Sequence, residues 1–167
     1  MRSAIEAISP ATLSSAATSL PIQPDGSYSY ALDDSLPATQ ALKAGQAGSD
    51  VFSYAVSDKA GHLDTGLLTV QVTGANDAPS ASVTVLAPIL ADSGLQLITA
   101  AQLLAGASDI DGDVLSVLGL TADSGSLVDN GNGTWNFTPA AGDQGSVDFH
   151  FTVSDGSLGT AASATLD

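Results

Sequence analysis

The residues best suited to chemistry are three aspartates at alternate positions, Asp109, Asp111 and Asp113, with Gly112 between the last two. At ~4 Å and an effective dielectric constant of ~20, two carboxylates repel by about 4 kcal/mol before salt screening. The chain has only three Lys and Arg residues to set against 18 acidic ones. A bound hard cation relieves such repulsion, and Ca²⁺ takes about six to eight oxygen ligands. We therefore predict a calcium site here; the alternative is a solvated acidic turn.

Other chemistry finds little support in the sequence. The loop is not an EF-hand, because Gly112 precedes the third aspartate and Leu120 stands where the bidentate glutamate would be. His62 and His150 are far apart and the chain has no cysteine, so neither a usual zinc site nor a catalytic triad is indicated. A pair of carboxylates for glycoside hydrolysis stays open among so many aspartates, but short loops offer little pocket. We predict that the chain is not an enzyme.

The charge balance narrows the partners. The formal net charge is −15, which argues against binding to nucleic acid or to an anionic membrane. No apolar run approaches the ~18 residues of a membrane span, and residues 1–20 show no signal peptide. The absence of cysteine excludes disulfides. We expect no nucleic-acid partner and no membrane insertion.

The elements that must position the acidic loop are mostly strands. Alternation of polar and apolar residues and the intervening turn signals predict strands over 27–32, 51–56, 66–72, 83–85, 114–120, 125–128, 135–137, 147–153 and 160–166. Turns are predicted at 24–26, 57–61 and 130–133. A helical turn is expected around 38–43. A short helix over 99–104 should begin with Thr99 as N-cap and end with Gly106 at C′.

The chain contains an internal repeat. Residues 52–58 (FSYAVSD) align with 149–155 (FHFTVSD), and residues 25–30 (DGSYSY) align with 132–137 (NGTWNF). Two copies of several short strands predict tandem β-sandwiches. We place one domain at 1–75, a linker at 76–79 and a second domain at 80–167. The alternating aromatic residues of both copies should face their own cores; a sugar-stacking platform is the alternative.

These landmarks resemble two repeats of large bacterial surface adhesins. The first unit resembles a VCBS repeat, through residues 25–30, residues 52–58 and the exit segment VTGANDAP at 72–79. The second resembles the bacterial cadherin-like repeat, through ASDIDGD at 107–113, GNGTWNFTP at 131–139 and VSDG at 153–156. The resemblance implies all-β architecture, with tandem immunoglobulin-like or cadherin-like Greek-key β-sandwiches.

The resemblance also implies calcium at the joint between repeats. Its ligands by motif match would be Asn76, Asp77, Asp109, Asp111 and Asp155. Asp113 is a further ligand or an acceptor just outside the ligand shell. From the residues alone, Asn76 and Asp77 are equally explained by a linker turn, and Asp155, like Asp58 in the first copy, by a turn cap.

The implied function is mechanical and adhesive. The chain would be a calcium-binding repeat region of an exported RTX-type adhesin, acting as a calcium-rigidified extender or adhesive module in cell-surface or biofilm attachment. We expect it outside the cell or at its surface, exported without an N-terminal signal peptide as part of a longer protein, and monomeric. Its partners would be calcium ions, neighbouring repeats and surface polysaccharide. The alternative is a calcium-dependent lectin-like module for acidic exopolysaccharide.

Overall fold

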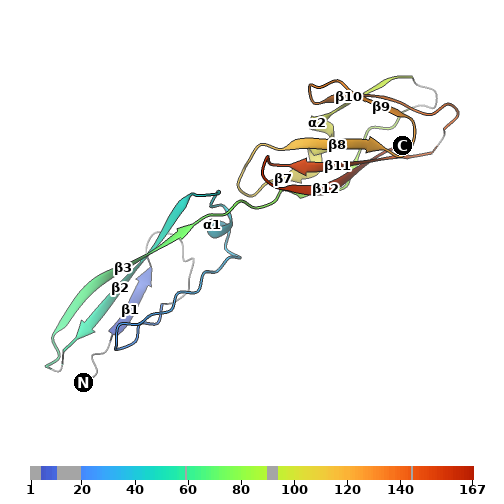
Figure 1. Ribbon diagram of the computed structural model, residues 1–167. Coiled ribbons are helices and arrows are strands. Elements are labelled where there is room, and N and C mark those ends of the chain that lie inside the picture. Colours follow the sequence, from blue (N-terminus) through green and yellow to red (C-terminus); the bar gives the residue numbers. More distant parts are fainter. Residues whose placement is uncertain (1–4, 11–19, 59, 90–93, 144) are drawn as a thin grey trace. The chain divides into compact units, whose positions relative to one another are not determined.

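A computed structural model of the chain describes residues 5–10, 20–58, 60–89, 94–143 and 145–167 (Figure 1). The chain divides into two compact units, Met1–Asn76 and Asp77–Asp167. Each unit has its own sheets and its own hydrophobic cluster. Within the described ranges, no helix has both the length and the apolar character needed to span a bilayer.

Unit 1 contains one three-stranded antiparallel sheet among its described residues. Its order is β1 (Ile5–Pro10), β2 (Ala47–Ser57) and β3 (Leu63–Thr73). β2 and β3 form a long hairpin that contains both strands predicted in this region. The predicted helical turn is α1 (Pro37–Gln40).

The strand predicted over 27–32 is wrong. Within residues 27–32, only Tyr28 forms a β-bridge, which is an isolated antiparallel bridge to Ile22. Alternation of polar and apolar residues produces a strand only where a neighbouring segment supplies a ladder of hydrogen bonds, and here the ladder stops at one bridge. Tyr28 is 52% exposed, whereas Tyr30 packs edge-on against Phe52 with ring centroids 6.2 Å apart. Only the second tyrosine therefore faces the core of unit 1.

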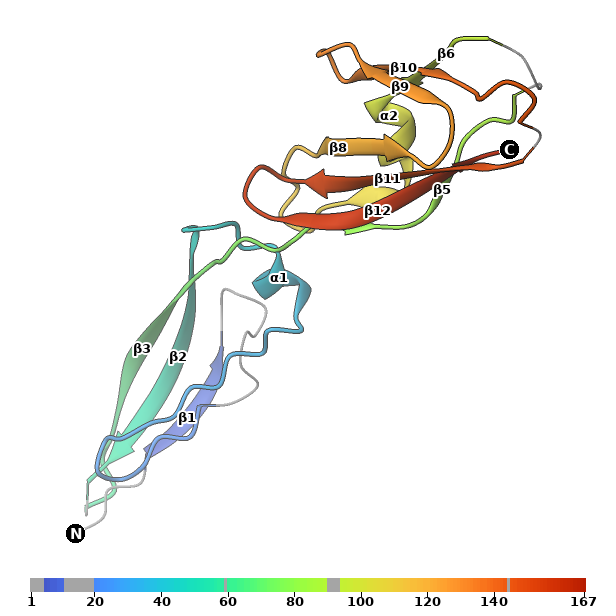
Figure 2. The ribbon, with the colours of Figure 1, turned by 45° about the vertical axis from the view of Figure 1, so that its right-hand side comes forward.

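Unit 2 is a β-sandwich of two main sheets (Figure 2). One sheet has the order β5 (Thr84–Val85), β12 (Gly159–Leu166), β11 (Val147–Ser154) and β8 (Ser116–Ala122). The other has the order β6 (Gln96–Thr99), β10 (Thr134–Thr138) and β9 (Ser126–Asp129). β6 pairs with β10 rather than with a strand next to it in sequence, and β8 is followed by a strand of the opposite sheet. This is the Greek-key connection of immunoglobulin-like sandwiches and agrees with the predicted fold class.

The core of unit 2 lies between these sheets. Phe137 of β10 and Phe149 of β11 are fully buried and meet edge to face, with ring centroids 5.1 Å apart. Trp135 is 6% exposed, which places the aromatic pair of β10 in the core as predicted. Burial of each large apolar side chain contributes about 1.5–3 kcal/mol, so these rings hold the two sheets together.

The short helix of unit 2 is α2 (Ala100–Leu103), followed by the 3₁₀ turn η1 (Leu104–Gly106). Thr99 is its N-cap, as predicted, and forms a capping box with Gln102. The prediction for Gly106 is wrong, because this residue lies in the 3₁₀ turn and has no left-handed backbone. A Cβ atom there would lie 2.5 Å from Ser82 Oγ, so Ser82 would have to move to accept a larger residue.

Candidate metal centre

The acidic loop is held at one end of the unit 2 sandwich by strand pairing on both sides. Before it, β7 (Ala107–Ser108) pairs with β4 (Ser80–Ala81), so the loop starts beside the first residues of the unit. After it, β8 begins at Ser116, which pairs with Ser154 and donates a hydrogen bond from Oγ to the Ser154 carbonyl at 3.1 Å. The loop thus lies near both the entry segment, residues 77–81, and the turn that follows β11.

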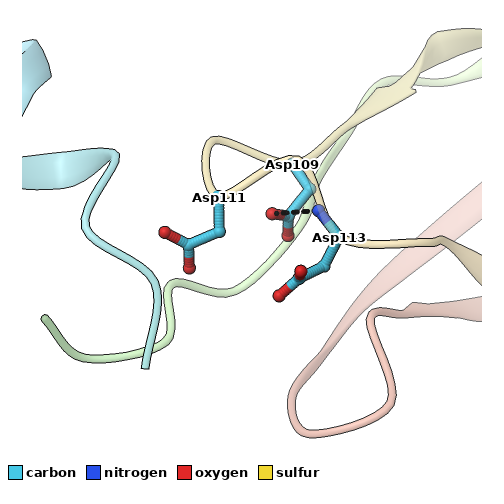
Figure 3. Close-up of side chains that lie close together, drawn as sticks. All are labelled: Asp109, Asp111 and Asp113. Atoms are coloured by element: carbon cyan, nitrogen blue, oxygen red, sulfur yellow. Dashed lines mark hydrogen bonds between the residues drawn. The ribbon is translucent and has the colours of Figure 1, made fainter. Parts of the chain in front are cut away.

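Three carboxylates of this loop converge. One oxygen atom each from Asp109, Asp111 and Asp113 lies within 4.8 Å of the others (Figure 3). Asp111 is only 5% exposed and the other two are partly buried, whereas the apolar neighbours Ile110 and Val114 are 50% and 88% exposed. Among the described residues, no other group of three or more His, Cys, Asp or Glu side chains comes this close. The local sequence therefore turns its acids inward and its apolar side chains outward.

Two of the carboxylates have one anchored oxygen and one without a partner. Oδ1 of Asp109 accepts a hydrogen bond from the Asp113 backbone N–H at 3.2 Å, and Oδ2 of Asp111 accepts one from the Asp77 backbone N–H at 2.9 Å. The second oxygens, Asp109 Oδ2 and Asp111 Oδ1, are buried and have no hydrogen-bond partner among the described residues. Buried oxygens without a partner are rare, because each costs about 1–3 kcal/mol of lost hydration. A cation bound here would satisfy both atoms.

The charge of unit 2 strengthens this reading. Residues 77–167 include 11 aspartates but no glutamate, lysine or arginine. For oxygens within 4.8 Å of one another, the repulsion is about 3 kcal/mol per pair at an effective dielectric constant of ~20, before screening. No Lys or Arg of the same unit can offset it. A divalent cation from solution can, and an all-oxygen donor set suits Ca²⁺.

The other predicted ligands, Asn76, Asp77 and Asp155, lie outside the acidic loop. Asp77 contributes its backbone N–H to the loop through the bond to Asp111, and its side chain is partly buried. Asn76 is the last residue of unit 1, so its part in the site stays a prediction. Thr160 Oγ1 donates to the Pro79 carbonyl at 2.6 Å, which ties the entry segment to the start of β12, just after the turn that carries Asp155.

Asp155 caps the turn between β11 and β12. Its Oδ1 accepts hydrogen bonds from the backbone N–H groups of Ser157 and Leu158, both at 2.6 Å. The counterpart in the first repeat behaves alike: Asp58 Oδ1 accepts from the N–H groups of Ala60 and His62. The His62 ring, 2.7 Å from Asp58 Oδ2, and these amides hold the pKa of the Asp58 carboxyl below its usual value. Turn capping therefore occurs at both positions, and a ligand role for Asp155 would be additional to it.

Sequence reasoning missed a buried polar pair in unit 1. Asp50 of β2 is completely buried, and its Oδ2 accepts a hydrogen bond from Tyr30 Oη at 2.7 Å. Burial, followed by the hydrogen bond to this carboxylate and its charge, raises the pKa of Tyr30 to about 12. The only sequence signal was that Asp50 stands two residues before Phe52 and so shares its face of the strand.

Part of the chain is similar in sequence to a curated protein. Over 53 residues the chain is 40% identical to the calcium-binding lectin RapA2 of Rhizobium johnstonii, a match that covers 32% of this chain and 22% of that protein. The chain thus corresponds to about a fifth of the relative's length.

Two solved structures are similar over nearly the whole chain. Extracellular cadherin domains 3–6 of protocadherin gamma B2 match 99% of this chain and 39% of that one, with 16% identity and a TM-score of 0.49. The endo-fucoidan hydrolase MfFcnA9 of glycoside hydrolase family 107 matches 98% of this chain and 27% of that one, with 23% identity and a TM-score of 0.34. Scores this low indicate nothing about function.

The family assignment rests on a broader match. The sequence profile of the cadherin-like domain matches residues 75–167, which is more than half of the chain and contains all of unit 2. The two-sheet Greek-key sandwich of that unit is the fold expected of such a domain. The chain belongs to the cadherin-like domain family.

Proposed function

We propose that the loop of residues 109–113 binds Ca²⁺ and that the chain is a calcium-binding adhesive module that works outside the cell or at its surface. The observation that carries this proposal is the pair of buried carboxylate oxygens without a partner, Asp109 Oδ2 and Asp111 Oδ1, inside a cluster of three carboxylates. Membership of the cadherin-like family and the likeness to a calcium-binding lectin support it.

The ligand set would exceed the loop itself. Asp109, Asp111 and Asp113 supply three side chains, whereas Ca²⁺ takes about six to eight oxygens. We propose that Asn76, Asp77 and Asp155, together with backbone carbonyls or water, complete the shell. Asp111 would then couple the ion to the entry segment, since its Oδ2 already accepts a hydrogen bond from the Asp77 N–H.

This coupling gives calcium a mechanical role. Without the ion, the carboxylates repel one another and strain the segment that enters unit 2. With it, the loop and the entry segment share one centre and the joint to the preceding repeat stiffens. Extracellular calcium modules bind at about 10⁻⁴–10⁻³ M, so the site would fill outside a cell and be empty in the cytosol. We propose that the parent protein is an exported RTX-type adhesin, that residues 1–75 are a VCBS-like repeat, and that the chain extends a distal binding region as a monomer.

Small-angle scattering and thermal unfolding with calcium and with chelator test the extender role. Calcium should raise the melting temperature of unit 2 and narrow the distribution of dimensions of the whole chain. Asp123→Asn is a matched control, because it removes one charge at an exposed residue of unit 2 while its side-chain oxygen can still accept the Asp148 N–H. If calcium changes neither stability nor dimensions, the extender function is wrong.

A lectin role is the second candidate, favoured by the 40% identity to RapA2 over 53 residues. Here the ion would bridge the aspartates and an acidic exopolysaccharide, which a unit without lysine or arginine cannot attract by itself. A glycan array read with calcium and with chelator separates the two candidates. Calcium-dependent retention of an acidic glycan supports the lectin, and retention of none leaves the extender.

A further inference from the structure

A recess lies at the side of the unit 2 sandwich where β8 and β9 are the edge strands of their sheets. It has a volume of about 290 Å³. Its apolar walls come from Val117, Leu118 and Leu120 of β8 and from Leu127 of β9. No residue of the proposed calcium loop lines it. The recess therefore needs an explanation of its own.

Two polar features distinguish this recess from an unfilled part of the core. Asp129 of β9 and Trp135 of β10 both line it, and they are directly paired across the two antiparallel strands. Residues paired in this way project from the same face of a sheet. Trp135 is a core residue, so Asp129 lies on the same face as Trp135 at the end of an edge strand, where it is exposed and its Oδ1 accepts the Gly131 N–H at 2.8 Å. A carboxylate and an indole ring that line the same recess are a combination that attracts a cation.

The two edge strands are poorly suited to pairing with another strand. β8 has a register shift against β11, and within it Gly119 has a φ of +64°. A bulge in one edge strand and a charged side chain on the other are devices that block edge-to-edge association. An added strand is therefore a poor occupant of this edge, whereas the recess, with a volume of about 290 Å³, can hold a single side chain.

Charge determines what that side chain can be. Residues 77–167 carry 11 aspartates and no lysine or arginine, so the field at the recess is negative. A second copy of this chain, with a net charge of −15, would be repelled. The apolar walls suit a hydrocarbon stem, and the Asp129–Trp135 pair suits a positively charged head group. Lysine has both parts, because its stem is apolar and its head is a compact ammonium group.

We propose that the recess between β8 and β9 binds the side chain of a lysine on a partner protein. The ammonium group meets the Asp129 carboxylate and the Trp135 ring, and the methylene stem lies along Leu118 and Leu127. This inference is independent of calcium binding and adds a protein-contact surface to unit 2.

Trp135 makes the test direct, because it is the only tryptophan of the chain. Nα-acetyl-lysine methylamide, which keeps its side-chain ammonium group, is titrated into the full chain at saturating calcium and constant ionic strength, and Trp135 fluorescence is recorded. Its neutral counterpart, N-acetyl-norleucine methylamide, is the matched control ligand. We expect a saturable change with the lysine compound at a dissociation constant on the order of millimolar, and a much weaker one with norleucine.

The variants distinguish a specific lysine-binding site from non-specific electrostatic attraction to an acidic protein. Asp129→Asn should weaken lysine binding about five- to tenfold, by loss of the charged partner; Asp123→Asn should leave it unchanged. Asp111→Asn, in the proposed calcium loop, should also leave it unchanged, so failure of the calcium proposal would not affect this result. Equal responses to lysine and norleucine, equal effects of Asp123→Asn and Asp129→Asn, or no saturable response would each overturn the proposal. So would a dimer of the chain in light scattering that Asp129→Asn disrupts.

Discussion

Replacing Asp111 with asparagine is expected to change the stability of unit 2 in opposite directions with and without calcium. The substitution keeps the shape of the side chain, and the amide oxygen can still accept the hydrogen bond that Asp77 N–H now gives to Oδ2. It removes one of the three converging charges and, at the same time, a proposed ligand. The two effects have opposite signs, so the presence of calcium decides which one dominates.

The magnitude follows from the cluster geometry. Asp111 faces two other carboxylates, each with an oxygen within 4.8 Å, and each contact costs about 3 kcal/mol at an effective dielectric constant of ~20. Asp109 and Asp113 are partly exposed, so solvent and salt reduce this. In chelator we expect Asp111→Asn to stabilise unit 2 by about 1–2 kcal/mol. At a calcium concentration ~100-fold above the dissociation constant, the wild type gains about 2.7 kcal/mol and the variant loses most of that gain.

The assay is denaturant unfolding followed by Trp135 fluorescence, which reports on the core of unit 2 because this residue is 6% exposed there. The two stability curves should cross between chelator and saturating calcium, with Asp123→Asn showing no crossing. If Asp111→Asn is less stable than the wild type in chelator as well, the repulsion argument is wrong. If it is equally stable in both conditions, Asp111 is not a ligand.

Four other predictions concern the two units around the site. Tyr30→Phe should destabilise unit 1 by about 1–3 kcal/mol, because it leaves the buried Asp50 carboxylate without its hydrogen bond; urea unfolding followed by circular dichroism measures this, and an unchanged midpoint would contradict it. The pKa of Tyr30 is raised to about 12, against an ordinary value of about 10. The stability that this shift gives to unit 1, about 1 kcal/mol after allowance for screening, should therefore be complete below pH ~10 and be lost as the pH rises through ~12. A spectrophotometric tyrosine titration in which every tyrosine ionises at its ordinary pH would exclude this. Thr99→Ala should cost about 1 kcal/mol through the lost helix cap, and Thr99→Ser much less; equal losses would rule the cap out. Gly125→Ala should lower the melting temperature of unit 2 by several degrees, because φ there is +80° and the new Cβ would lie 2.6 Å from the Thr138 carbonyl oxygen; an unchanged melting temperature would refute this.

The strands of unit 2 were predictable because its two sheets bury one face each. In β11 the residues Val147, Phe149, Phe151 and Val153 are all buried, and alternation alone locates such a strand. The N-cap at Thr99 was equally visible, since a capping box is read from residues three apart. Local rules failed where a partner strand was needed. The alternating residues 27–32 gained only one bridge, which no local pattern could reveal.

The acidic loop was predictable for a related reason. Asp109, Asp111 and Asp113 are neighbours in sequence, and a loop that turns at Gly112, with φ of +71°, brings them together without help from distant residues. What the sequence could not show is which oxygen remains without a partner, because that depends on the Asp77 N–H, 34 positions away from Asp111. The buried Asp50–Tyr30 pair was missed for the same reason: its partners are 20 positions apart in the sequence.

Isothermal titration of calcium into the wild-type chain and into Asp109→Asn/Asp111→Asn tests the central claim most directly. The account predicts saturable binding to the wild type at about 10⁻⁴–10⁻³ M, in preference to Mg²⁺, which demands a regular octahedral shell. It also predicts loss of that binding in the double variant and its retention in Asp123→Asn. Calcium binding of equal affinity and stoichiometry in the wild type and the double variant, or no binding to the wild type at millimolar calcium, would contradict it.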